Sequence, residues 1–288
     1  MLRFARAGLL ALTATFAATA CAPVAQNTPQ SIAAERQNSA NLVRKLDSSG
    51  KLIKDRRLQR YLNGVVSRVA SQRPRGSVPI RAFIVKDADV NAFTTGGGYV
   101  FFNAGMLAAL ENEAQLASVA AHEIAHIDRG HIQAQRSNRT AIGIGAALAT
   151  IGAAAAGIDP NIVQGVVGLG ANAAVANFSR GQETDADNTG IRYLVRAGYS
   201  ATEGAKSFDV LRRVSAGRGG ASFFASHPAP RDRKSNLLAQ ARSMGARSGR
   251  VGRANHDRAT RRLRREVLQF YESRGRLREA AQIRRNLR

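Results

Sequence analysis

The sequence predicts an α+β fold that is mainly helical, with a small β-sheet just before a helix that carries an H-E-x-x-H pattern. Apolar residues recur every three to four positions in most segments, and three short stretches with β-strand character lie together, separated by turn residues. The 288 residues allow one medium domain with appendages, or two small domains. With 27 glycines and no tryptophan, the core should consist of small side chains on closely packed helices.

The beginning of the chain has the pattern of an export signal. Arg3 and Arg6 precede an apolar stretch over residues 8–20, which is too short and too rich in alanine and threonine for a membrane span. We therefore expect a signal peptide at residues 1–20 and a linker at residues 21–41. Export makes nucleic acid an unsuitable partner.

Cys21 allows two interpretations. Ala18-Thr19-Ala20 fits an ordinary signal-peptidase site, whereas the same residues followed by Cys21 resemble a lipobox. Because Cys21 is the only cysteine, it cannot form an internal disulfide, which favours its lipidation. The expected location is the periplasmic side of the outer membrane, held by the lipid anchor; a soluble periplasmic protein is the alternative.

The elements that follow can be assigned from periodicity and turn residues. Residues 42–69 have a helical pattern, and Asn112 is a suitable N-cap for the motif helix, which should end near Gly130. Ser179 with Gln182 forms a capping box for a later helix. Strands are expected at residues 78–86, 91–95 and 99–102, with a glycine turn at residues 96–98.

The run His122-Glu123-Ile124-Ala125-His126 predicts a zinc site. A spacing of four residues places both imidazoles on one helix face, where they can bind a single tetrahedral Zn²⁺, one per chain. Glu123 lies about 100° around the helix, so it can reach a water at the metal and act as general base.

A third ligand must come from elsewhere in the chain. The H-E-x-x-H-x-x-G-x-x-H extension fails, because Arg129 and Ile132 stand where glycine and histidine would be required. Glu183 and Asp187 share one face of a later helix. Glu183 is the expected third ligand, and Asp187 is expected to accept the Nδ1–H of His122.

The other histidines are weaker candidates. His227 lies in a proline-bounded loop, where an imidazole could stabilise an oxyanion or simply be exposed. His131 follows His126 by five residues, off the metal face, and a structural or supporting role is expected. His256 lies near the C-terminal end and is expected to have no catalytic role.

Beyond residue chemistry, residues 42–240 resemble family forty-eight of the metallopeptidases, the HtpX-related gluzincins, and within it the periplasmic BepA-like and LoiP-like group. The motifs that carry the resemblance are Asn91-Ala92-Phe93, Gly97-Gly98-Tyr99-Val100, Asn112-Glu113-Ala114-Gln115-Leu116, the His122 to His126 run, Glu183-x-x-Ala186-Asp187-x-x-Gly190, Ala197-Gly198-Tyr199 and Ser226-His227-Pro228.

The resemblance implies a zincin-like (gluzincin) metallopeptidase domain at residues 42–240, with zinc on His122, His126 and Glu183. Glu123 would be the base, and His227 would act in the transition state. The strand over residues 97–102 would be the sheet edge that binds an extended peptide. Unfolded or misassembled envelope proteins are the implied substrates, in protein quality control.

Two segments allow more than one interpretation. The uncharged residues 141–158 could form a membrane hairpin or packed helices near the site. Residues 241–288 are expected to be a basic helical tail, since residues 231–288 hold 18 lysines and arginines against five acidic residues within a net charge of +23. This tail is either a solvated extension or a contact to anionic lipid.

Two other functions compete with the peptidase. One is a chaperone-like outer-membrane assembly factor with a gated metal site, and the other is a basic scaffold with a vestigial site. Glu123 argues against the scaffold, because a site without chemistry has no need for it. A loop within residues 130–178 could also inhibit the enzyme by occupying the fourth zinc position. The oligomeric state does not follow from the sequence.

Overall fold

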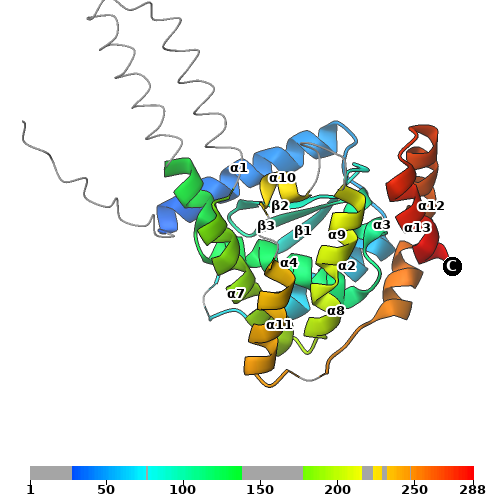
Figure 1. Ribbon diagram of the computed structural model, residues 1–288. Helices are drawn as coiled ribbons and strands as arrows, with labels where there is room; N and C mark the ends of the chain where they lie inside the picture. The colour runs from blue at the N-terminus through cyan, green and yellow to red at the C-terminus, as the bar shows by residue number, and fades with distance from the viewer. Residues whose placement is uncertain (1–27, 76, 138–177, 216–222, 229–231, 247) are drawn as a thin grey trace, which may run out of the picture.

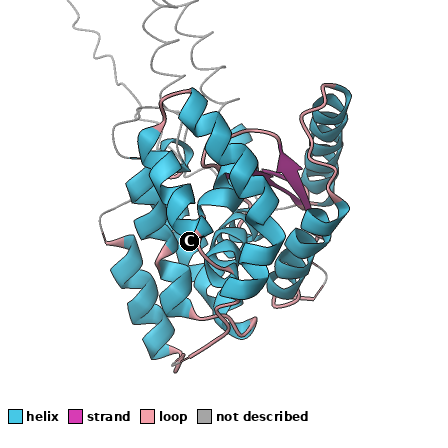
Figure 2. Cartoon of the chain, turned by 90° about the vertical axis from the view of Figure 1, so that its right-hand side faces the viewer, coloured by secondary structure: helices cyan, strands magenta, loops and turns pink. Residues whose placement is uncertain are grey.

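The computed structural model describes residues 28–75, 77–137, 178–215, 223–228, 232–246 and 248–288. Helices make up most of this part of the chain, and a small three-stranded sheet lies among them (Figures 1 and 2). The described helices include none with the length and apolarity needed to cross a membrane. The expected signal peptide, Cys21 and the uncharged stretch at 141–158 lie outside the described residues.

The described elements, in chain order, are α1 (Pro29–Ser48), α2 (Arg56–Ala70), β1 (Arg81–Val85), β2 (Ala92–Gly96), β3 (Tyr99–Asn103), α3 (Ala104–Ala109), α4 (Glu113–Asp128), α7 (Arg180–Arg196), α8 (Ala201–Ala205), α9 (Ser207–Ser215), α10 (Phe223–Ser226), α11 (Arg233–Ser243), α12 (Arg253–Ser273) and α13 (Leu277–Leu287). The α+β class, mainly helical with a small sheet before the motif helix, is confirmed.

The sheet has the strand order β1-β3-β2, with β3 parallel to β1 and antiparallel to β2. The glycines between β2 and β3 have positive φ angles, which allows the tight turn. The expectation that residues 97–102 form the edge is therefore wrong, because β3 pairs on both sides. The edge next to α4 is β2.

Helix α1 covers the outer face of the sheet. Leu42, Val43 and Leu46 pack against a cluster of Val85, Tyr99 and Phe101. Glu35 on the same helix accepts a hydrogen bond from the backbone N–H of Gly97 at 2.8 Å. Residues 29–41 are thus helical and not part of a linker, since Thr28 caps a helix that begins at Pro29 and this helix shields aromatic side chains of the sheet.

Beneath the inner face of the sheet lie α2 and α4. The apolar side of α2 is buried through Leu58, Leu62, Val65, Val66 and Val69. In α4, the Asn112 side chain accepts the N–H of Gln115 at 3.0 Å, and nearly every residue of the helix is buried. The motif helix is therefore held rigidly at the centre of the domain.

Helices α12 and α13 close the C-terminal end of α3 (Figure 1, red). Arg264 donates to the carbonyls of Ala108 and Leu110 at 3.2 and 2.8 Å, and Asn286 donates to Ala109 at 2.8 Å. These carbonyls lack partners within α3 itself. Both helices are therefore part of the domain core and not the solvated extension that the sequence suggested.

The packing of α13 leads to a stability prediction. Ile283 is fully buried in the core cluster, so Ile283→Ala should lower the free energy of unfolding by about 2–5 kcal/mol. Leu277→Ala on the same helix is the control, because its side chain is 68% exposed. Urea unfolding would measure both. Equal, small effects would mean that α13 is not docked in solution.

Candidate metal centre

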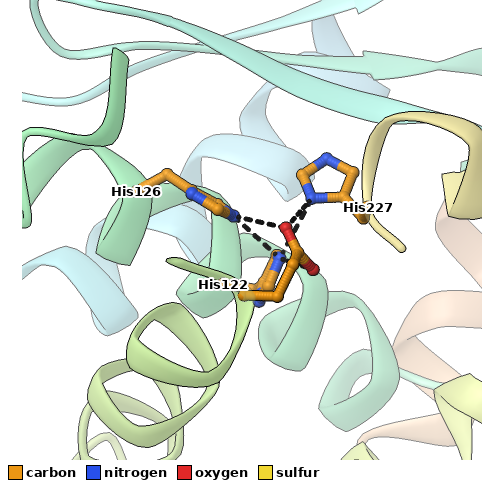
Figure 3. A group of neighbouring side chains, drawn as sticks. His122, His126 and His227 are labelled. Atoms are coloured by element: carbon orange, nitrogen blue, oxygen red, sulfur yellow. Dashed lines mark hydrogen bonds and ion pairs between the residues drawn. The ribbon is translucent and has the colours of Figure 1, made fainter. Parts of the chain in front are cut away.

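His122 and His126 project from one face of α4 and approach each other through their Nε2 atoms, which lie 3.0 Å apart. Both side chains are buried. Figure 3 shows their rings and that of His227 turned toward a common point. The helical spacing of the motif therefore produces the convergence that the sequence predicts.

Helix α7 brings its carboxylates to the same point. Glu183 Oε1 lies 3.3 Å from His126 Nε2, and Glu183 Oε2 lies 3.5 Å from His122 Nε2. Asp187 Oδ1 lies 3.0 Å from His122 Nδ1, as expected for an acceptor of that N–H. The predicted capping box of Ser179 and Gln182 starts this helix, which places Glu183 in its first turn.

The imidazole of His227 lies in direct contact with the other ligand side chains, whereas a residue that only stabilises an oxyanion does not need this contact. Its Nδ1 is 3.0 Å from Glu183 Oε1 and 3.2 Å from His122 Nε2. The short helix α10 positions it, because the His227 N–H donates to the carbonyl of Phe223 at 2.9 Å and the two rings stack. The structure thus places His227 among the potential ligands.

The four side chains fit a metal ion. The ligand atoms of His122, His126, Glu183 and His227 all lie within 4.8 Å of one another, and the close pairs are separated by 3.0–3.5 Å. Tetrahedral zinc with bonds of 2.0–2.1 Å separates its ligand atoms by about 3.3 Å. The donor set and its spacing therefore suit a tetrahedral cation.

The charge of the site also favours a cation. Burial alone would lower the pKa of His122, but the charge of Glu183 and the contact with Asp187 raise that pKa to about 9. The carboxylates thus attract positive charge to the point where the ligand atoms converge. A metal ion would supply this charge with the imidazoles neutral.

Glu123 lies beside this cluster with both carboxylate oxygens buried and without a hydrogen-bond partner among the described residues. The imidazole of His227 lies beside it, with Nε2 3.5 Å from Glu123 Oε1. Burial raises the pKa of Glu123, and the nearby His227 opposes that effect. Glu123 is therefore free to exchange a proton with a molecule that enters the site.

Arg233, at the start of α11, is a residue of the site that the sequence reasoning missed. Its guanidinium donates to Asp187 at 2.6 and 2.7 Å and to Glu183 at 2.7 Å, and it is buried. Burial raises the pKa of Asp187, but His122 and Arg233 lower it overall. The sequence did contain a signal for this residue. The two carboxylates of Glu183 and Asp187, once buried, require a positively charged partner, and Arg233 stands six residues after His227.

His131 contacts the ligand set from behind. Its Nδ1 is 2.9 Å from His126 Nδ1, and its Nε2 is 3.2 Å from Asp185 Oδ2. If His126 Nε2 binds a metal, its Nδ1–H can donate to His131, which in turn donates to Asp185. His256, by contrast, lies in the core between Tyr61 and the Leu110 carbonyl, and burial lowers its pKa to about 3.

Comparisons with known proteins agree with this geometry. Residues 53–241 match peptidase family M48, and the chain belongs to this family. It is 31% identical to a putative beta-barrel assembly-enhancing protease of Vibrio cholerae, over 69% of this chain and 42% of the relative. It is 31% identical to the beta-barrel assembly-enhancing protease of Escherichia coli K12, over 59% of this chain and 36% of the relative.

A shorter relative is the metalloprotease LoiP of Escherichia coli K12, which is 30% identical over 55% of this chain and 62% of the relative. The chain spans less than half the length of the two assembly-enhancing relatives. The resemblance inferred from the motifs is confirmed, and family membership implies a metal-dependent peptidase.

The contact between His126 and His131 leads to a prediction about metal affinity. His131→Ala removes the acceptor that orients His126, so zinc should bind about 10–100-fold more weakly. Competition with a chromophoric chelator would measure the affinity. Arg129→Gln is the matched control, because Arg129 contacts Asp185 but not His126. An unchanged affinity in His131→Ala would contradict a role in orienting the ligand.

Proposed function

We infer from the family and the site geometry that this chain is a zinc-dependent endopeptidase, with His122, His126 and Glu183 as ligands of one zinc ion and Glu123 as general base. The observation that carries this proposal is the carboxylate of Glu123, which is buried beside the ligand cluster without a partner in the described part of the chain. An unpaired buried carboxylate is costly, and a function in proton transfer explains why it is there.

The proposed reaction assigns a role to each neighbouring residue. When bound, zinc acts as a Lewis acid and lowers the pKa of water to about 7. Glu123 accepts the proton of the attacking water, and its raised pKa brings its basicity nearer to neutral pH. Asp187 holds His122 through Nδ1, which would leave Nε2 available to a bound ion, while Arg233 keeps Asp187 charged.

His227 has two proposed positions. With Nδ1 among the ligand atoms, it can complete a set of four and close the site. Catalysis needs an open fourth position, so His227 must withdraw before turnover, and its imidazole can then donate to the oxyanion. The stretch at 130–178, considered above as an inhibitory loop, lies mostly outside the described residues.

The proposed substrates are unfolded or misassembled envelope proteins. Two relatives are named as proteases that enhance β-barrel assembly, which supports this class. Strand β2 offers an edge next to α4, and an extended peptide can pair with such an edge in any sequence context. The proposed location is the periplasmic side of the outer membrane through lipidated Cys21, with a soluble periplasmic protein as the alternative.

A second candidate is a chaperone-like assembly factor whose metal site is gated. The position of His227 in the ligand cluster supports it, because a site with four protein ligands has no place for a substrate. The names of the assembly-enhancing relatives are compatible with either function.

The general-base proposal predicts the behaviour of Glu123→Gln. This variant should cleave an unfolded protein such as casein at least about 100-fold more slowly than the wild type, because the water loses its proton acceptor. Zinc content should stay the same, since Glu123 is not among the clustered ligand atoms. Peptide release and metal analysis would be measured on the same samples.

A wild-type chain that holds zinc but cleaves nothing would favour the gated assembly factor. Zinc loss in Glu123→Gln would instead show that Glu123 supports the ligands and would leave the base unassigned.

A further inference from the structure

A cavity of about 380 Å³ lies between α2 and α12, away from the metal centre. Such a volume is within the range of small-ligand sites. Among the described residues, its walls are rich in arginine and include a single acidic side chain, that of Glu113. The charged residues of the lining are Arg57, Arg60, Arg68, Arg250, Arg258 and Glu113.

Four of the five arginines make no side-chain hydrogen bond or ion pair in the described part of the chain, although the charge of Arg57 acts on the nearby carboxylate of Asp55. Arg57, Arg60, Arg68 and Arg258 are exposed, and their guanidinium groups make no hydrogen bond or ion pair there. Arg250 and Glu113 neutralise each other through a contact of 2.9 Å. The cavity therefore has an excess of positive charge on walls contributed mainly by two helices.

Gly64 lines the cavity and is exposed. It lies in the interior of α2, where glycine is less favourable than alanine, yet an added Cβ would meet nothing within 4 Å. Packing therefore does not require glycine at this position. A side chain there would occupy the space between the arginines, which is consistent with a need for room in the cavity.

We propose that this cavity binds a ligand with two or more phosphate groups. Guanidinium groups pair with phosphate oxygens in a bidentate manner, and several arginines facing one volume suit several phosphates. Nucleic-acid bases lack a stacking platform, because Tyr61 is the single aromatic residue among the described residues of the lining and its hydroxyl bonds to His256 at 2.8 Å. The phosphates can come from a lipid head group or from a soluble polyphosphate.

The test uses the full chain and two probes, inorganic tripolyphosphate in calorimetry and vesicles that contain cardiolipin, whose head group carries two phosphates, with phosphatidylcholine vesicles as the neutral reference. The double variant Arg60→Gln with Arg258→Gln should bind about tenfold more weakly or worse. The matched control is Arg242→Gln with Arg285→Gln, which removes the same charge from exposed positions outside the cavity. Binding of the control should stay near that of the wild type.

Gly64→Leu separates the cavity from general electrostatics, because it adds a side chain to the lining without changing the charge. We expect weaker binding with an unchanged or higher melting temperature. Binding of only one probe would identify the source of the phosphates and support the site. Equal losses in both double variants, binding of neither probe, or preferential binding of polyglutamate would overturn it. Casein cleavage should be unaffected in every one of these variants. The result of the phosphate-binding test is therefore independent of the proposed peptidase activity.

Discussion

The metal centre depends on how closely α7 can approach α4. At Gly190 the two helices are so close that a Cβ would lie 3.1 Å from the carbonyl group of Ala121 and 3.2 Å from the nitrogen of His122. Glu183 precedes Gly190 by two helical turns and therefore lies on the same face of α7. The missing side chain thus brings the carboxylate within reach of both motif histidines, and a larger residue would separate the ligands.

This close approach creates an electrostatic problem that the rest of the site solves. Glu183 and Asp187 are buried, and buried carboxylates are tolerated only with charged or hydrogen-bonded partners. Arg233 bridges both of them from α11, and His122 contacts each one. The loop that carries His227 and the start of α11 are therefore tied to the ligands, so that the site is assembled from three separate parts of the chain.

The sequence was sufficient where chemistry is local. The four-residue spacing predicted that His122 and His126 share one helix face and that Glu183 and Asp187 share a face of a later helix, and the structure brings these side chains together. Turn residues located the three strands. The sequence was insufficient to predict features that depend on packing between residues far apart in the chain. The order of the strands depends on a parallel pairing of β1 with β3, which no local pattern encodes. The position of Arg233 and the docking of α12 on α3 depend on partners that are distant in sequence. The docking of α12 was not predicted because its many arginines suggested an exposed helix, and a sequence does not distinguish buried from exposed arginines.

The capping of α3 by Arg264 and Asn286 has a consequence for the order in which the protein can mature. All candidate metal-site residues lie between positions 122 and 233, so they leave the ribosome before the residues that cover the carbonyl end of α3. Helix α3 directly precedes α4, the helix that holds the motif. A nascent chain could therefore present the complete set of metal-site side chains on a scaffold that is not yet closed, and full rigidity would come only once synthesis has passed Asn286.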